Sequence, residues 1–580
     1  ITGTTGDVAI TGTTINVDEA IALSSTGTVT MTGGTVIDNT SITTAAGNIL
    51  FAGTATTENG AVGIDTGAGG GNITFNDTLT VVGGTLTLTA GTGNVVLTGA
   101  VGITSYDLTV ISSTATTITG GITGTTGDVA ITGTTINVDG AIALSGDGTV
   151  TLTGASVISG VDITTVSTTE QNAITFTGAV SLNTGSVAIG TGAGDGNIFF
   201  SSTLNGTQAL ALTSGLGDIT FTGTVGNANA LGAVTIASAA DVTASAAFSA
   251  ASLIQSAGTG DTQFDDAVAL TAVEGLQLTT NTVTINSTIN TLAGGLLGVV
   301  TITNAGLLDI ASGADMNLDG AFTQNGEGEV QTAGDITTDA AAINFLRAVT
   351  ITDGEAVAFN TGAGVVGTIT FQSTLDGSTE HTENITLTAG TGHVNFDGIV
   401  GDNIALGDVS IVSATNVVAD FAFTAKSVAQ TAGAGLTTFT GAVNTTGADD
   451  TVGGAVDITA TGAVTFSSSI TTTGGADTGT AGKNAGAVTI SGSVVVLNAI
   501  TAAGSAPLDP ADTAGAGGNV TVTATDGTPT ITLNGTISTV GAAATTTGGN
   551  GGTVLFNNNV VLGAGTTINT NGGAAVTEGT

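Results

Sequence analysis

The densest group of side chains that could do chemistry lies between residues 380 and 397. Glu380, His381 and Glu383 come first, and His393 and Asp397 follow in the next strand-like segment. Imidazole and carboxylate groups are ligands of divalent metals, and one turn of chain could bring the two histidines together at a loop. The alternative is a solvated loop that holds the chain's only two histidines. We predict this alternative, and therefore no metal-binding residue.

Two pairs of adjacent acids raise the question of glycoside hydrolysis, which needs two carboxylates at a fixed separation in a groove. The pairs are Asp265 with Asp266 and Asp449 with Asp450. Neighbouring side chains on a strand point to opposite faces, so neither pair meets this requirement. We predict no catalytic residue, no cofactor-binding residue and no enzyme. An enzyme that acts on polysaccharides is the third of three functional hypotheses.

Calcium is bound by the glycine-rich repeats of β-roll toxins, which place Gly-Gly-x-Gly-x-Asp in tandem nonapeptides. Gly69–Asn72 (GGGN) and Gly192–Gly196 (GAGDG) match this pattern only in part. Aspartate also forms turns without any metal. We therefore predict no cofactor, and Ca²⁺ at scattered turn carboxylates is the alternative.

Basic residues are almost absent. The chain has 580 residues and a formal net charge of −41, and Arg347, Lys426 and Lys483 are its three Lys and Arg residues. Because affinity for nucleic acid and anionic membranes comes largely from Lys and Arg, we expect neither as a partner. No uncharged apolar run approaches the ~20 residues of a membrane helix, so we expect no membrane insertion. The acids are scattered singly, which is typical of a solubilising surface.

The elements that must position these residues are short β-strands. Apolar residues alternate with Thr, Asn or Ser, as in Thr85–Thr89 (TLTLT) and Asp218–Thr222 (DITFT). Alternation with period two, rich in Val, Ile and Thr, is the pattern of a half-buried strand. Helical periodicity is missing, and Gly, Asn and Asp punctuate the strands at short intervals. The chain is therefore expected to be all-β.

Internal repeats indicate how the strands assemble. Residues 1–18 and 122–139 are identical, and Thr213–Val268 aligns without a gap to Thr388–Val443, an offset of 175 positions. Long-period self-similarity is the signature of repeat architectures, in which each unit buries its apolar face against its neighbours.

A recurring phrase sets the length of one repeat. Glycine, then Asp, Asn or Thr, then an apolar residue recurs at Gly6, Gly27, Gly47, Gly71 and Gly93. Steps of about 20–25 residues with two or three short strands predict a parallel β-helix, or β-solenoid, in which each strand pairs with its equivalent one coil further on. We expect residues 1–444 to form such a solenoid with short coils.

The period changes at about residue 445. Val456, Val488, Val520 and Val554 open equivalent strands, and Gly/Ala/Thr-rich stretches such as Thr472–Gly486 fill the extra length. We predict that residues 445–580 continue the solenoid in coils of about 32–34 residues, each with a long projecting loop. A separate C-terminal β-domain is the alternative.

Phenylalanines occupy one position of the strand phrase, and we expect them to stack in interior ladders. Phe248 and its counterpart Phe423 in the aligned copy are expected to be buried. The positions predicted for the ladders are Phe75, Phe176, Phe199, Phe221, Phe371 and Phe396.

Four phrases resemble the repeats of very large bacterial surface proteins: Thr89–Val95, Gly223–Gly226, Thr440–Thr446 and Gly517–Thr521. They are similar to the filamentous-haemagglutinin type of adhesin and to autotransporter passenger regions. The resemblance implies a right-handed parallel β-helix, export to the cell surface and an adhesive or structural role. The absence of cysteine fits an extracellular location.

These observations predict a non-enzymatic extracellular structural protein, a stiff rod that forms or belongs to a surface fibre, sheath or adhesin stalk. Neither Ile1–Ile10 nor the segment before Thr580 shows a helical or charged cap, so we expect head-to-tail pairing with copies of the same chain. The second hypothesis is an adhesin that binds a cell-surface glycan, a receptor or another surface protein. Its aromatic residues should then gather at one site, yet the one tyrosine, Tyr106, stands alone.

Overall fold

A computed structural model describes residues 1–169, 171–352, 354, 356–362, 364, 366–479, 481–526 and 531–575. The chain divides into two compact units, Ile1–Asn281 and Thr282–Thr580. Both units are all-β, with parallel strands stacked as a β-solenoid, and the described residues form about 20 turns in all. The predicted fold class is confirmed.

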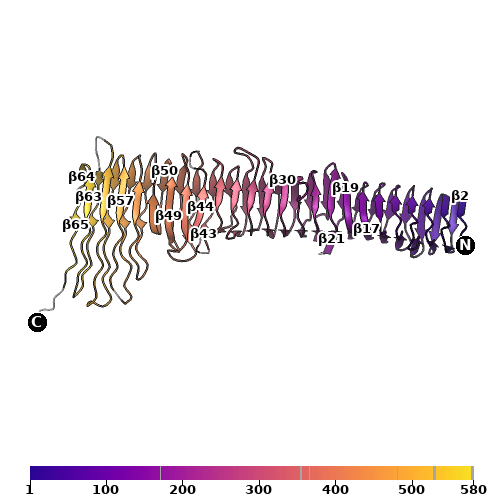
Figure 1. Cartoon of the computed structure of the whole chain (residues 1–580), viewed down its shortest axis with the longest axis horizontal. Coiled ribbons are helices and arrows are strands. Elements are labelled where there is room, and N and C mark those ends of the chain that lie inside the picture. The colour runs from indigo at the N-terminus through magenta and orange to yellow at the C-terminus, as the bar shows by residue number, and fades with distance from the viewer. Residues whose placement is uncertain are drawn as a thin grey trace. The chain divides into compact units, whose positions relative to one another are not determined.

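A turn of the first unit contributes two or three strands, so a strand pairs with the second or third strand after it. Equivalent strands of successive turns thus lie side by side (Figure 1). One face illustrates the pattern, with Leu86 between Val62 and Leu108 in register. Its strands are β8 (Val62–Asp65), β11 (Leu86–Thr89), β14 (Leu108–Ile111), β17 (Val129–Val138), β19 (Val150–Ser159), β21 (Gln171–Phe176), β24 (Gly196–Phe200) and β27 (Ile219–Phe221).

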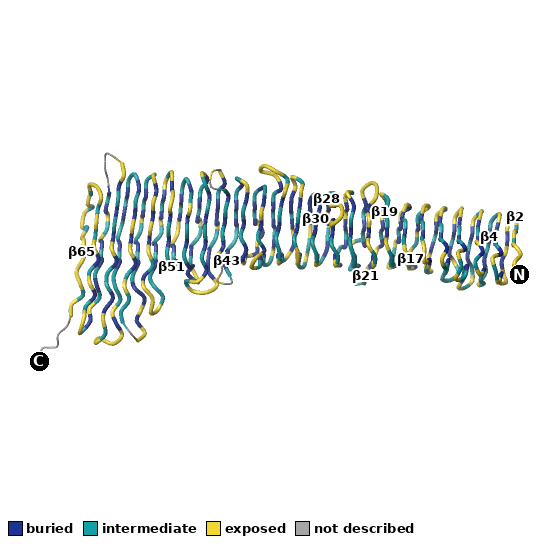
Figure 2. The backbone as a smooth tube through the Cα atoms, viewed as in Figure 1, coloured by how far each residue is buried: buried dark blue, intermediate teal, exposed yellow. Residues whose placement is uncertain are grey.

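The recurring phrase of glycine, a polar residue and an apolar residue marks strand positions that pair between successive turns. Val8, Val29, Ile49, Ile73 and Val95 each follow one copy of the phrase, and they pair in that order. Each apolar side chain thus lies on its equivalent one turn away. The alternating pattern puts these residues inside and the intervening Thr, Ala or Asn outside, which Figure 2 shows as alternating dark and light segments along the tube.

The identical segments 1–18 and 122–139 do not lie on the same face. From Val95 the column that began at Val8 passes to Thr116 in β15 (Ala115–Ile118) and then to Ile136. Val129, the counterpart of Val8, instead pairs with Leu108 on a neighbouring face. The 121-residue repeat is therefore a whole number of turns plus part of one.

The interior contains the predicted ladders of phenylalanine rings. Phe176, Phe200 and Phe221 stack with centroids 4.9 and 5.2 Å apart, and parallel rings also stack between Phe371 and Phe396 at 5.7 Å. Phe199 was predicted in this ladder, and that was wrong. Strand register pairs Phe199 with Thr220 on the outer surface and puts Phe200 inside, because a shift of one residue reverses every side chain.

A second ladder runs along a corner of the first unit. The Oδ1 atom of Asn48 accepts the backbone N–H of Asn72 at 2.8 Å, Asn72 accepts that of Asn94 at 2.8 Å, and Asn94 accepts that of Ala115 at 3.2 Å. The polar residue after the glycine thus bonds to the backbone of the next turn. This role explains why the phrase takes Asn or Asp there.

In the second unit, the turns lengthen along one face. Val428, Val456, Val488, Val520 and Val554 are successive partners, which confirms the equivalence predicted for the last four. They belong to β51 (Phe423–Gln430), β54 (Val456–Thr459), β57 (Val488–Gly492), β60 (Val520–Ala524) and β63 (Val554–Asn557).

The glycine-rich stretches between these strands are ordered arms, the long orange and yellow segments below the strands in Figure 1. Bonds along the stack join equivalent arms, as from Gly474 N to Ala503 O at 3.2 Å. Bonds across each loop join its two arms, as from Gly486 N to Thr472 O at 2.7 Å. A Cβ atom on Gly486 would lie 1.9 Å from the Gly454 oxygen, so only glycine fits where the arms meet.

Candidate functional site

The predicted polar cluster is divided between two corners. Glu380 and His381 lie in the loop between β46 (Leu375–Gly377) and β47 (Asn384–Thr388), whereas His393 begins β48 (His393–Phe396). The five extended residues of β47 span about 16 Å between these places. The two histidines are therefore not brought together, and among the described residues no group of three or more His, Cys, Asp or Glu side chains could hold a metal ion.

Glu383 has a structural position. It is fully buried, and its carboxylate accepts Ser378 Oγ–H at 2.9 Å and Thr379 N–H at 3.0 Å. Its backbone oxygen accepts Gly407 N–H at 2.7 Å. The buried carboxylate thus closes the 378–383 loop and fixes the position of the exposed side chains on it.

Asp397 directly follows Phe396, and Asp420 directly follows Ala419, which is the partner of Phe396 one turn further on. Partial burial raises the pKa of the Asp397 carboxyl above its ordinary value, and the negative charge of Asp420 raises it further. The same cause, burial, raises the pKa of Asp335 despite its hydrogen bond from Ala358 N–H. The fold therefore places carboxylates of neighbouring turns close together, although their like charges disfavour the ionised form of Asp397 and Asp335.

The two acid pairs considered for hydrolysis lie on exposed loops. Asp265 and Asp266 follow β31 (Asp261–Phe264), where Asp266 Oδ1 accepts the N–H of Ala267 at 2.7 Å. Asp449 and Asp450 lie at the end of a loop in the second unit, and both are exposed.

Asp450 belongs to an ion-pair cluster that sequence reasoning missed. Lys483 Nζ lies 3.5 Å from Asp450 Oδ1 and 3.9 Å from Asp477 Oδ1, whose side chain is completely buried. Hydrogen bonds from Thr478 lower the pKa of Asp450. Asp477 also accepts Leu508 N–H at 2.8 Å, so the cluster links neighbouring glycine-rich loops. The only sequence signal was the rarity of lysine.

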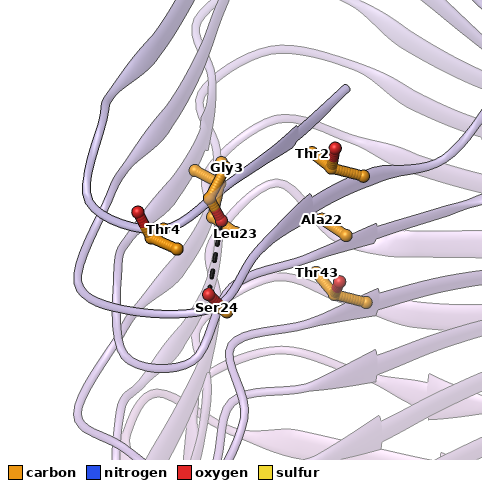
Figure 3. A pocket seen from close by; sticks show the side chains of 7 residues that line it. All are labelled: Thr2, Gly3, Thr4, Ala22, Leu23, Ser24 and Thr43. Carbon is orange, nitrogen blue, oxygen red and sulfur yellow. Dashed lines mark hydrogen bonds between the residues drawn. The ribbon is translucent and has the colours of Figure 1, made fainter.

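One pocket lies at the first turns of the first unit (Figure 3). Its volume is about 660 Å³, and Ser24 Oγ donates to Gly3 O at 3.4 Å on its wall. The lining offers hydroxyl and backbone groups with no ionisable side chain. The residues are Thr2, Gly3, Thr4, Ala22, Leu23, Ser24 and Thr43.

A smaller pocket has more varied chemistry. Its volume is about 300 Å³, and Glu380, His381 and Lys426 contribute its ionisable groups. The other lining residues are Thr446, Gly447, Ala448, Thr451 and Val452. We call this the His381 pocket. It lies wholly within the second unit and brings Lys426, distant in sequence, to the predicted polar loop.

Comparison with known protein families, curated proteins and solved structures found no match to the chain. In the described part of the chain, no helix is long and apolar enough to cross a membrane.

Proposed function

We propose that this protein is a non-enzymatic structural protein of the cell exterior, whose β-solenoid units are stiff rods of a surface fibre, sheath or adhesin stalk. Continuous parallel pairing is the observation that carries this proposal. Within each unit, strands bond to partners in the turns on both sides, and apolar ladders fill the interior. Deforming such a unit requires many hydrogen bonds and packed contacts to be disturbed together.

The distribution of charge supports an exposed structural role. The net charge is −41, and the acidic residues are spread along the turns. Single charges beside outward-facing strands keep long stacks soluble and oppose side-by-side aggregation. The exposed loop positions of the two acid pairs support a role other than catalysis, because glycoside hydrolysis needs paired carboxylates in one groove.

Apolar side chains of the last described turn are exposed. Leu562 and Ile568 are 56% and 44% exposed, yet their partners one turn earlier, Leu533 and Ile537, are completely buried. The positions are inward-facing ones that a further turn would cover. In our proposal the turn of a second copy pairs with them, and the contact repeats because it is head-to-tail.

Sedimentation and electron microscopy of the 580-residue chain test this assembly. We expect concentration-dependent filaments, and we expect the double variant Leu562→Glu with Ile568→Glu to sediment as a monomer. Val412→Glu, a charge at an exposed position away from this edge, is the matched control and should still polymerise. A native chain that remains monomeric at every concentration would overturn the assembly proposal.

A further inference from the structure

The His381 pocket is formed by two loop insertions. Ten positions separate Leu375 from Ile385, whereas six separate their counterparts Leu204 and Leu210 in the first unit. The four extra residues belong to the loop that carries Glu380 and His381. The repeat therefore folds without this loop.

The second insertion lies on the opposite side of the pocket. Thirteen positions separate Val443 from Val456, whereas eight separate their counterparts Val268 and Leu276. The longer connection contains Thr446, Ala448, Thr451 and Val452, which line the pocket.

Two turns lie between the two loops: the turn of Val400 carries a bend at residues 401–405, and the turn of Phe423 carries no loop at this corner. Leu375, Val400, Phe423 and Val443 are partners in four consecutive turns, and β51 passes through the corner from Phe423 as one unbroken strand. Lys426 lies on this strand and lines the His381 pocket. Its counterpart in the aligned copy is Ala251, so the fold itself does not require a charge there.

The walls of the pocket are fixed by hydrogen bonds. The buried Glu383 carboxylate closes one loop, and His381 N donates to Ala405 O at 2.9 Å while its φ is 59°. This left-handed conformation is uncommon for a residue other than glycine and persists only where surrounding contacts hold it. On the other loop, Thr451 Oγ donates to Ala448 O at 2.8 Å.

The polar groups of the pocket have polar neighbours but keep unused hydrogen-bonding capacity. Glu380 Oε1 lies 3.6 Å from His381 Nε2, and Lys426 Nζ lies 3.1 Å from Asp408 Oδ2. A carboxylate with four lone-pair sites and an ammonium group with three donors each have places left for a ligand. Val452, 62% exposed, and Ala448 add an apolar surface beside them.

We propose that the His381 pocket binds one residue of a neutral sugar. Hydroxyl groups both donate and accept, so neighbouring hydroxyls of a pyranose can donate to Glu380 and accept from Lys426 together. The apolar face of the ring would pack on Val452 and Ala448. A volume of about 300 Å³ is at the small end for ligand sites and suits a single sugar ring.

The charge of the chain favours a neutral ligand over an acidic one. A net charge of −41 repels anions at long range, and the Lys426 ammonium already has a partner of opposite sign in Asp408. A metal ligand is disfavoured because no group of three metal-binding side chains is found in the described residues. This site goes beyond the proposed structural function and does not depend on filament assembly.

Calorimetry and ligand-observed NMR with the methyl glycosides of glucose, galactose and mannose test the proposal, with glucuronic acid and CaCl₂ as separate probes. We expect millimolar binding of at least one neutral glycoside. Glu380→Gln and Val452→Asn, both at exposed positions, should each weaken it about tenfold. Glu327→Gln, an exposed carboxylate outside the pocket, is the control and should bind as the native chain does.

Three results would overturn the sugar site. These are no binding of any neutral glycoside to the native chain, binding of glucuronic acid or Ca²⁺ alone, and equal weakening by the control variant. Electron microscopy of the same samples separates this outcome from failure of the structural proposal, because the pocket variants leave the strand edge unchanged.

Discussion

At the scale of single residues, position inside or outside the solenoid decides the role of a side chain more than its chemical type does. Phe423 and Phe421 are two residues apart, yet Phe423 is completely buried and Phe421 is 53% exposed. Phe423 packs edge-on against Phe396 and Phe439, with centroids 5.4 and 5.6 Å away. The predicted burial of Phe423 and Phe248 is confirmed.

Phe423→Asp should therefore be strongly destabilising. It removes a ring from the interior ladder and buries a carboxylate without a charged partner, at a cost of at least about 3 kcal/mol. Thermal denaturation followed by circular dichroism should show a clear fall in melting temperature. Phe421→Asp is the matched control, and similar melting of the two variants would contradict the strand register.

At the scale of elements, the glycine-rich arms are the part of the fold that depends most on close backbone approach. Arms of neighbouring turns and the two arms of one loop are hydrogen bonded in different directions. Side chains would keep these backbones apart. A segment that composition alone describes as a long loop is thus an ordered part of the second unit.

Gly486→Ala should disrupt these arms locally. The added methyl would lie 1.9 Å from Gly454 O, a backbone atom that cannot rotate away, so the arms must separate. We expect faster amide hydrogen exchange in the arms while the strand amides of β57 stay protected. Gly479→Ala is the control, because no atom lies within 4 Å of its added Cβ. Equal exchange in the two variants would show that the arms are not closely packed.

At the scale of the whole chain, we propose that contacts between turns stabilise the fold without a bound metal. The polar side chains at the corners bond to the backbone of the next turn, as Asp7 Oδ1 does to Thr28 N at 2.8 Å. The oxygens of these carboxylates accept hydrogen bonds from the protein itself. Repeat proteins of this kind derive their stability from pairs of neighbouring units.

Removal of divalent cations should therefore have little effect on folding. We expect EDTA to change the melting temperature of the chain by a few degrees at most, since no dense ligand set is present in the described residues. Melting curves with EDTA, and with EDTA followed by excess CaCl₂, measure this. Loss of the β-sheet signal in EDTA would instead support calcium at the turn carboxylates.

The sequence by itself determined the class of fold and much of the pairing. Alternation with period two gives each strand one apolar face, and the glycine phrase recurs at the length of one turn. Val8, Val29 and Ile49 could therefore be aligned as partners without coordinates. The equivalence of Val456, Val488, Val520 and Val554 was predicted in the same way, because the burial of identical faces permits only one register.

Only the tertiary structure decided which side chains meet at a corner. The face occupied by Val129 depends on the summed lengths of all preceding turns, and the choice between Phe199 and Phe200 depends on one residue of register. The His381 pocket likewise joins loops from non-adjacent turns over Lys426. The local pattern determines which side chains each strand buries. The number of residues between the strands of each turn determines which loops lie next to one another.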